Sequence, residues 1–165
     1  DHKVPIDLHV EPMDRSNSHE QSVFAELDEI FNRYPDITVI LAHTAMTSAA
    51  NVERLIVRYP RLYFSIKVVG RPKHWHNLEP VNFSKKKKAW LYEDWAQLLE
   101  RYPERFFIGS DYKFARKMKK SPGDSMSVKK YTRYIKRYRR LLGSLEPQAA
   151  RQIAWDTPRK LFKME

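Results

Sequence analysis

The chain has 165 residues, of which 42% are hydrophobic and 13% aromatic, and it carries a formal net charge of +11 with no cysteine. This length suits one domain with a hydrophobic core, and the aromatic content argues against a disordered chain. The lack of cysteine excludes disulfides, thiolate metal ligands and a cysteine nucleophile, and no apolar run reaches the roughly 18–20 residues of a membrane span.

Strand-like and helix-like patterns alternate along the chain. Strands are predicted at 4–10, 37–43, 62–68 and 105–110. Helices are predicted from apolar spacing at 19–33, 48–59 and 86–102, and then near 126–142 and 147–155. Each of the first three helices closes on an Arg-Tyr-Pro triplet, because proline cannot continue a helix and disfavours helix for the residue before it. This alternation predicts an α/β fold with a parallel sheet of βα units.

The second predicted strand supports the parallel arrangement. Residues 37–42 are almost all apolar, which is typical of a strand buried on both faces. Segments 69–87 and 113–125 are predicted to be long loops, and long loops inside a compact domain often carry function. No segment has the composition of a linker, so we expect residues 1–165 to form a single domain.

The positive charge is concentrated in one segment. Residues 113–140 contain twelve basic residues and one acid, whereas the rest of the chain is balanced. Such a field attracts anions, for example substrate carboxylates, phosphates, nucleic acid or acidic lipid. A solvated basic helix face with no partner fits the same pattern. Helical spacing predicts a buried stripe opposite this basic face, formed by Val128, Tyr131, Ile135, Tyr138 and Leu142.

Polar residues close the four predicted strands. His9 ends the first and His43 the second, Lys67 lies at the end of the third, and Asp111 ends the fourth. In parallel α/β folds, the carboxyl ends of the strands meet where sites are built. Imidazole nitrogen and carboxylate oxygen are suitable ligands for zinc or a similar divalent ion, and both groups can transfer protons. One such residue alone is typical of a packed core histidine or a loop cap, but three at equivalent strand ends favour a functional site.

Four strand segments and the last helix together resemble the amidohydrolase-2 group of the amidohydrolase superfamily. Residues Pro5–His9 are similar to the fifth strand of that family's barrel, and Tyr34–His43 to the sixth, which ends in an Ala/Gly-His pair. Arg61–Ser65 is similar to the seventh strand, and Arg105–Tyr112 to the eighth, with its Gly-Ser/Thr-Asp signature. Residues Ile153–Phe162 are similar to the family's last helix. The resemblance covers nearly the whole chain in the right order.

The resemblance implies a TIM-type (β/α) barrel and a metal-dependent hydrolase or decarboxylase. Such an enzyme would act on a small anionic organic substrate through a metal-activated water. His9 would be a metal ligand, and His43 would hold or polarise the substrate or the attacking water. Asp111 would bind the divalent metal, for which we expect zinc, and take a proton from that water. The side chains expected to bind the substrate are Lys67, Tyr112, Lys113 and Arg116.

The sequence departs from the family pattern in three places. Asp156-Thr157-Pro158 stands where Asn-Ala usually precedes the last helix, and Lys113 stands where proline often follows Gly-Ser-Asp-Tyr. No strand here can supply the His-x-His metal pair of the family's first strand. His74-Trp75-His76 has that spacing but follows the strand that resembles the seventh, so we interpret it as a loop feature at the surface or facing the pocket.

The length provides about four βα units, whereas a complete eight-stranded barrel needs roughly 200–250 residues. We therefore expect the C-terminal half of a barrel, holding an incomplete metal site. Because a half-barrel has open sheet edges, we expect it to pair with a missing N-terminal half or to self-associate. No targeting signal is recognisable and we expect a cytoplasmic protein, although the chain starts at Asp1 rather than Met, so a true N-terminus can have been cut away.

Two other functions remain open from the residues alone. The first is a module that binds nucleic acid or an acidic surface through residues 113–140, where tyrosines alternate with lysines and arginines that could contact phosphates. The expected buried stripe in this segment makes nucleic acid the less favoured partner. The second is a catalytically inactive remnant of the barrel, and the family resemblance does not separate it from an enzyme.

Overall fold

The computed structural model describes residues 4–10, 20–67, 91–109 and 128–164. In these ranges four strands form one parallel sheet in the order β1-β2-β3-β4, namely β1 (Ile6–Leu8), β2 (Val39–Leu41), β3 (Leu62–Ile66) and β4 (Phe106–Ile108). The helices are α1 (Glu20–Arg33), α2 (Ala49–Arg58), α3 (Glu93–Arg101), α4 (Val128–Leu142), α5 (Pro147–Arg151) and α6 (Thr157–Leu161). The predicted parallel sheet of βα units is confirmed.

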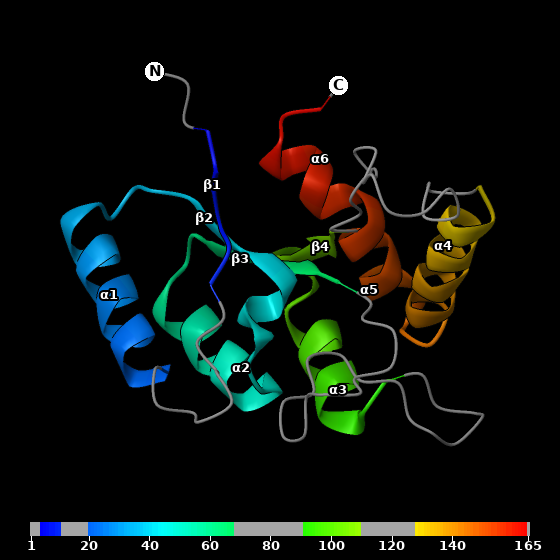
Figure 1. The fold of residues 1–165 in the computed structure, drawn as a ribbon, viewed down its shortest axis with the longest axis horizontal. Helices are drawn as coiled ribbons and strands as arrows, with labels where there is room; N and C mark the ends of the chain where they lie inside the picture. Colours follow the sequence, from blue (N-terminus) through cyan, green and yellow to red (C-terminus); the bar gives the residue numbers. More distant parts are fainter. Residues whose placement is uncertain (1–3, 11–19, 68–90, 110–127, 165) are drawn as a thin grey trace, which may run out of the picture.

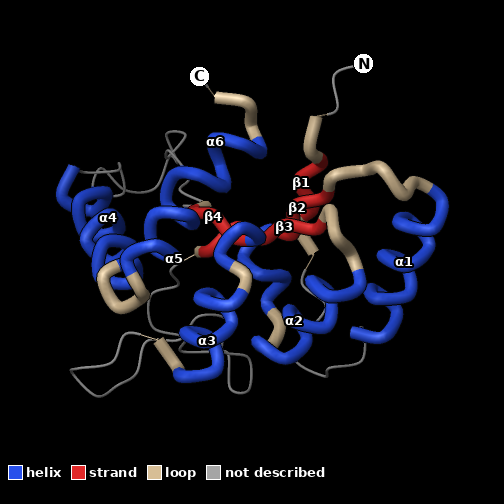
Figure 2. The backbone as a smooth tube through the Cα atoms, turned by 180° about the vertical axis from the view of Figure 1, so that it is seen from behind, coloured by secondary structure: helices blue, strands red, loops and turns tan. Residues whose placement is uncertain are grey.

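The carboxyl ends of all four strands lie along one edge of the sheet, which is called its carboxyl edge below. Helices α1, α2 and α3 lie along one side of it, and α5 and α6 lie near β4 (Figure 1, Figure 2). Because each strand is followed by a helix that returns the chain, all four strands point the same way. Residues that follow two adjacent strands, such as β1 and β2, are therefore neighbours in space although they are far apart in the chain.

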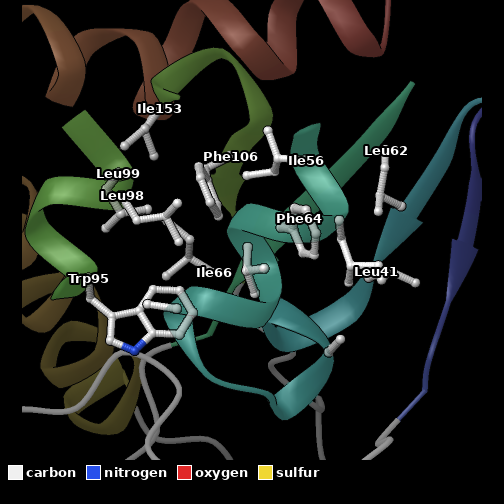
Figure 3. Close-up of a cluster of buried hydrophobic side chains, with 14 of the residues drawn as sticks. Leu41, Ile56, Leu62, Phe64, Ile66, Trp95, Leu98, Leu99, Phe106 and Ile153 are labelled. Carbon is white, nitrogen blue, oxygen red and sulfur yellow. The ribbon is translucent and has the colours of Figure 1, made fainter. Parts of the chain in front are cut away.

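The hydrophobic core lies between the sheet and the helices. Strand residues alternate sides, so Leu62, Phe64 and Ile66 of β3 all enter this core, and each is fully buried. Burying one such side chain contributes roughly 1.5–3 kcal/mol. Figure 3 shows them with their partners Leu41, Ile56, Trp95, Leu98, Leu99, Phe106 and Ile153. The prediction that the second strand is buried on both faces is confirmed, since Val39, Ile40 and Leu41 are at most 2% exposed.

The helix ends follow from local chemistry. The Ser48 hydroxyl caps α2 by accepting a hydrogen bond from the Asn51 backbone N–H at 3.3 Å. The helix predicted at 86–102 begins later than expected: Glu93 is its first residue, and Tyr92 is an N-cap with extended backbone angles. Residues 86–90 of the prediction lie outside the described ranges. The acids at the start of α3, Glu93 and Asp94, suit the positive end of a helix dipole.

The last helical stretch is longer than predicted. It runs from α5 through a π-helical segment, η3 (Gln152–Asp156), into α6, and so ends at Leu161 instead of residue 155. Pro158 lacks a backbone N–H and ordinarily interrupts an α-helix. The wider π turn just before it lets the chain continue, because π segments rearrange the i→i−4 bonding at that point.

Helix α4 corrects the predicted stripe at 128–142. Tyr138 and Leu141 are buried at 4% and 0% exposure, and Leu142 is partly buried against the core. Tyr131 and Ile135, however, are 47% and 37% exposed. The stripe is thus exposed at Tyr131 and Ile135 and buried at Tyr138, because helical spacing indicates which face is apolar but not how far the core extends beneath it. No helix in the described ranges is long and apolar enough to cross a membrane.

Candidate functional site

Two of the predicted site residues meet at the carboxyl edge of the sheet. His9 follows β1 and is exposed, whereas His43 follows β2 and is 4% exposed. Their imidazole rings lie edge to face, with centroids 4.3 Å apart and an interplanar angle of 79°. The pairing of Leu8 with Leu41 sets this meeting, since it brings the chain just beyond both strands to the same level. One imidazole therefore faces solvent and the other is held within the protein.

His43 sits in a strained turn and not at the end of a strand. The strand predicted at 37–43 ends at Leu41, and a 3₁₀ turn, η1 (Ala42–Met46), follows it. His43, Thr44 and Ala45 all adopt left-handed backbone angles, with φ of 48°, 56° and 54°. This conformation costs a residue other than glycine roughly 1–2 kcal/mol. Such strain persists only where surrounding contacts enforce it, and it is concentrated at functional sites.

Burial and one short hydrogen bond support this turn. Thr44 and Ala45 are at most 1% exposed, so leaving the turn would expose them. The Thr44 hydroxyl donates to the His43 carbonyl oxygen at 2.5 Å. Local preference does not explain this turn, because a positive φ is especially unfavourable for a β-branched residue such as Thr44, so the buried surroundings must enforce it.

Ser65 on β3 connects this turn to the end of β4. Its hydroxyl oxygen accepts a hydrogen bond from the His43 backbone N–H at 3.3 Å, and the residue is 8% exposed. On its other side lies Gly109, where an added Cβ would come within 2.5 Å of the Ser65 Cβ. Only glycine therefore fits beside Ser65. Sequence reasoning assigned no role to Ser65, although its place two residues before Lys67 on an alternating strand puts both on one face.

Gly109 is held from both sides. Its backbone N–H donates to the Ile66 carbonyl at 3.0 Å, which extends the pairing of β3 with β4 by one residue. Its carbonyl oxygen accepts a hydrogen bond from the Tyr138 hydroxyl at 3.1 Å. A buried residue of α4 thus fixes the backbone that leads into the Gly-Ser-Asp motif, whereas the sequence predicted for Tyr138 either a place in the buried stripe or, in the nucleic-acid alternative, a stacking role.

The remaining predicted site residues divide into one that is described and several that are not. Lys67 is partly buried and follows directly after β3, at the same edge as the histidines. Asp111, Tyr112, Lys113 and Arg116, and the triplet His74-Trp75-His76, lie outside the described residues.

The donor set in the described ranges suits a divalent metal only in part. His9 and His43 offer two imidazoles, the ligand type that zinc and similar ions accept. No group of three His, Asp or Glu side chains close enough to hold an ion is found within the described part of the chain. Since a zinc site takes at least three protein ligands, this pair alone is an incomplete site.

A hollow elsewhere on the molecule does not contribute to this site. A groove of about 610 Å³ lies between α1 and α2, with Phe24, Asn51 and Tyr59 among its lining residues. Neither imidazole lines it. Two of its charged lining residues, Arg58 and Asp28, form an ion pair at 3.0 Å.

The chain has a parallel βα sheet with two imidazoles at its carboxyl edge. It is therefore an α/β protein of the class in which ligands bind at the carboxyl ends of the strands. A family model described as Amidohydrolase matches residues 1–164, and the chain belongs to this amidohydrolase family, as its resemblance predicted. The family is one of metal-dependent hydrolases and decarboxylases in general, and its members usually bind a divalent metal. No curated protein matches the chain, and no solved structure matches it.

Proposed function

We propose that this chain is the C-terminal part of a metal-dependent hydrolase or decarboxylase that acts on a small anionic organic substrate. The observation that carries the proposal is the meeting of His9 and His43, with ring centroids 4.3 Å apart, at the carboxyl edge of a sheet in a chain of the amidohydrolase family. Core packing alone does not require two imidazoles at the carboxyl edge of the sheet, whereas binding a metal and a substrate does.

The roles divide according to exposure and charge. The exposed His9 is the metal ligand, with Asp111 as a second ligand and proton acceptor, and the buried His43 holds or polarises the substrate or the attacking water. When bound, a divalent ion, for which we propose zinc, lowers the pKa of a nearby water toward ~7. Lys67, Tyr112, Lys113 and Arg116 attract and bind the anionic substrate. Cleavage of a carbon–carbon bond would make the enzyme a lyase.

Zinc titration of the purified chain, followed by calorimetry, tests the ligand assignment. Wild type is expected to bind zinc weakly. The reason is that no strand of this sequence supplies the His-x-His metal pair of the first strand of the family's barrel. His9→Ala and Asp111→Ala are each expected to weaken the binding at least tenfold, as loss of a ligand does. Unchanged affinity in both variants would remove the metal site from the proposal.

Asp36→Ala is the matched control for the carboxylate. Asp36 lies on an exposed turn, where it pairs with Arg61 at 3.5 Å and its side chain is 77% exposed. Its removal changes the net charge as Asp111→Ala does but takes no ligand away. It is therefore expected to leave zinc affinity at the wild-type value.

We further propose that the complete enzyme is a TIM-type barrel and that this chain is its C-terminal half within a single domain. Four parallel strands with an exposed apolar edge strand support this. Ile6, in β1, is 45% exposed, and Val4, two residues before it, is 70% exposed. Apolar residues on an edge strand call for a neighbour. That neighbour is the N-terminal half-barrel or, in its absence, a second copy of the chain.

A second function is supported by α4. Its exposed Tyr131 and Ile135 lie on a helix whose last turns expose Lys136, Arg139 and Arg140, a surface suited to nucleic acid or another acidic surface. Steep salt dependence of binding to generic single-stranded nucleic acid, lost in Arg139→Glu with Arg140→Glu, would favour this function. Absence of binding at low salt would exclude it.

A further inference from the structure

The two segments that lead into the proposed site are joined through one side chain. The His43 backbone N–H donates to Ser65 Oγ at 3.3 Å, and Gly109 packs directly on the other side of Ser65. Ser65 belongs to β3, the strand between β2 and β4, so it lies between the two segments in the sheet as well. A change at Ser65 therefore reaches both the turn after β2 and the backbone that leaves β4.

The His43 turn needs such support because its backbone angles are unfavourable. Three consecutive residues without the freedom of glycine have φ between 48° and 56°. A hydrogen bond to the first of them opposes relaxation toward ordinary angles, since the His43 N–H would lose its acceptor as the peptide turned. Ser65 is 8% exposed, so little water is available to replace that acceptor.

We propose that Ser65 is a positioning residue that holds the His43 turn in its left-handed conformation and so sets where the His43 imidazole lies relative to His9. Ser65 acts through His43 and Gly109, and not on a substrate. The Gly109 contact prevents Ser65 from shifting, and Gly109 is itself fixed by the Ile66 carbonyl and the Tyr138 hydroxyl. The conformational assignment is independent of the reaction, whereas its consequence for how His43 holds the substrate or the attacking water rests on the proposed function.

Amide hydrogen exchange of the chain, measured residue by residue by NMR, tests the assignment. In Ser65→Ala the His43 amide is expected to exchange about fivefold faster, as loss of one net hydrogen bond implies. The Val39 amide, which donates to the Arg61 carbonyl at 3.1 Å, is expected to keep its rate. Equal acceleration at both amides, or none at His43, would overturn the proposal, since the first indicates general destabilisation and the second indicates no constraint.

Two further variants complete the experiment. Ser65→Cys keeps the shape of the side chain, but its sulfur is a weak acceptor, so the exchange rate of the His43 amide is expected to be intermediate. This variant keeps the test possible if Ser65→Ala fails to fold. Ser144→Ala removes a hydroxyl that donates to the Leu141 carbonyl at 2.7 Å, away from the turn, and is expected to leave His43 unchanged. An effect of Ser144→Ala equal to that of Ser65→Ala would overturn the assignment.

Zinc titration separates this inference from the proposed function. The proposed ligands are His9 and Asp111, so the zinc titration of wild type reports on the metal site, whereas the His43 amide reports on Ser65. If wild type bound no zinc but the His43 amide still responded to Ser65→Ala, the proposed metal site would fall and the positioning role of Ser65 would be supported. If zinc bound and the His43 amide did not respond, the positioning role would be overturned and the metal site would remain.

Discussion

At the scale of single residues, steric fit at the end of β4 is tighter than any property of the sequence indicates. Gly109 lacks a side chain because an added Cβ would come within 2.5 Å of the Ser65 Cβ and 2.8 Å of its Oγ. Both neighbours are constrained, Ser65 by the strand and Gly109 by its two hydrogen bonds. The glycine of the Gly-Ser-Asp motif is therefore required by packing, independently of any chemistry at Asp111.

Gly109→Ala is expected to lower the free energy of unfolding by about 1–3 kcal/mol, the usual cost of overpacking a filled space. Urea denaturation followed by circular dichroism measures it. Gly143→Ala is the control, since Gly143 lies in the exposed turn after α4 and its Cβ would meet the Arg139 backbone carbonyl at 3.1 Å, which requires a shift of only a few tenths of an ångström; alanine also restricts the unfolded chain. Equal losses in the two variants would contradict the steric argument.

At the scale of elements, α4 packs against the core through its second half. Tyr138 and Leu141 are buried, and Tyr138 also donates its hydroxyl to Gly109. Tyr131 and Ile135 continue the same apolar stripe toward the start of the helix but are exposed. Position along the helix, and not helical phase, therefore decides which of these residues stabilises the fold.

Leu141→Ala is expected to destabilise the chain by about 2–5 kcal/mol, because a fully buried leucine leaves a cavity. Ile135→Ala, on the same stripe, is expected to cost about 1 kcal/mol or less, since exposed positions contribute little. Thermal and urea unfolding of both variants measure the difference. Comparable losses would mean that the first half of α4 is buried in solution.

At the scale of the whole molecule, the described part of the sheet is covered near β4 and open at β1. The end of α6 covers β4, where Phe162 meets Phe107 edge to face with ring centroids 5.5 Å apart. Ile6 on β1 is 45% exposed. The exposed apolar edge at β1 is open to the addition of another strand, and it predicts association through β1.

The isolated chain is expected to sediment as a concentration-dependent mixture of monomer and larger species in analytical ultracentrifugation. Ile6→Lys is expected to shift it toward monomer, because a charge on an edge strand opposes strand addition. Val57→Lys, at a 70% exposed position on α2, adds the same charge elsewhere and is expected to have no such effect. A wild type that stays monomeric at all concentrations would contradict the open-edge argument.

The amino-acid sequence by itself determined the parallel α/β class, the order of its elements and the strand ends at which to look for chemistry. Arg-Tyr-Pro triplets, apolar spacing and β-branched runs act locally, so they can be recognised without knowledge of distant contacts. They led to His9, His43 and Lys67, which the structure places at one edge. The resemblance of the strand segments indicated the amidohydrolase family, and the match over residues 1–164 confirms it.

Only the tertiary structure decided three other features. The left-handed turn at His43 ends β2 two residues early, because Ser65 and the burial of Thr44 and Ala45 outweigh the extended preference of the chain. Ser65 and Tyr138 acquire roles from partners that are distant in sequence, and no local pattern encodes such contacts. The exposure of Tyr131 and Ile135 depends on where the core stops, which is a property of the packed sheet and helices together.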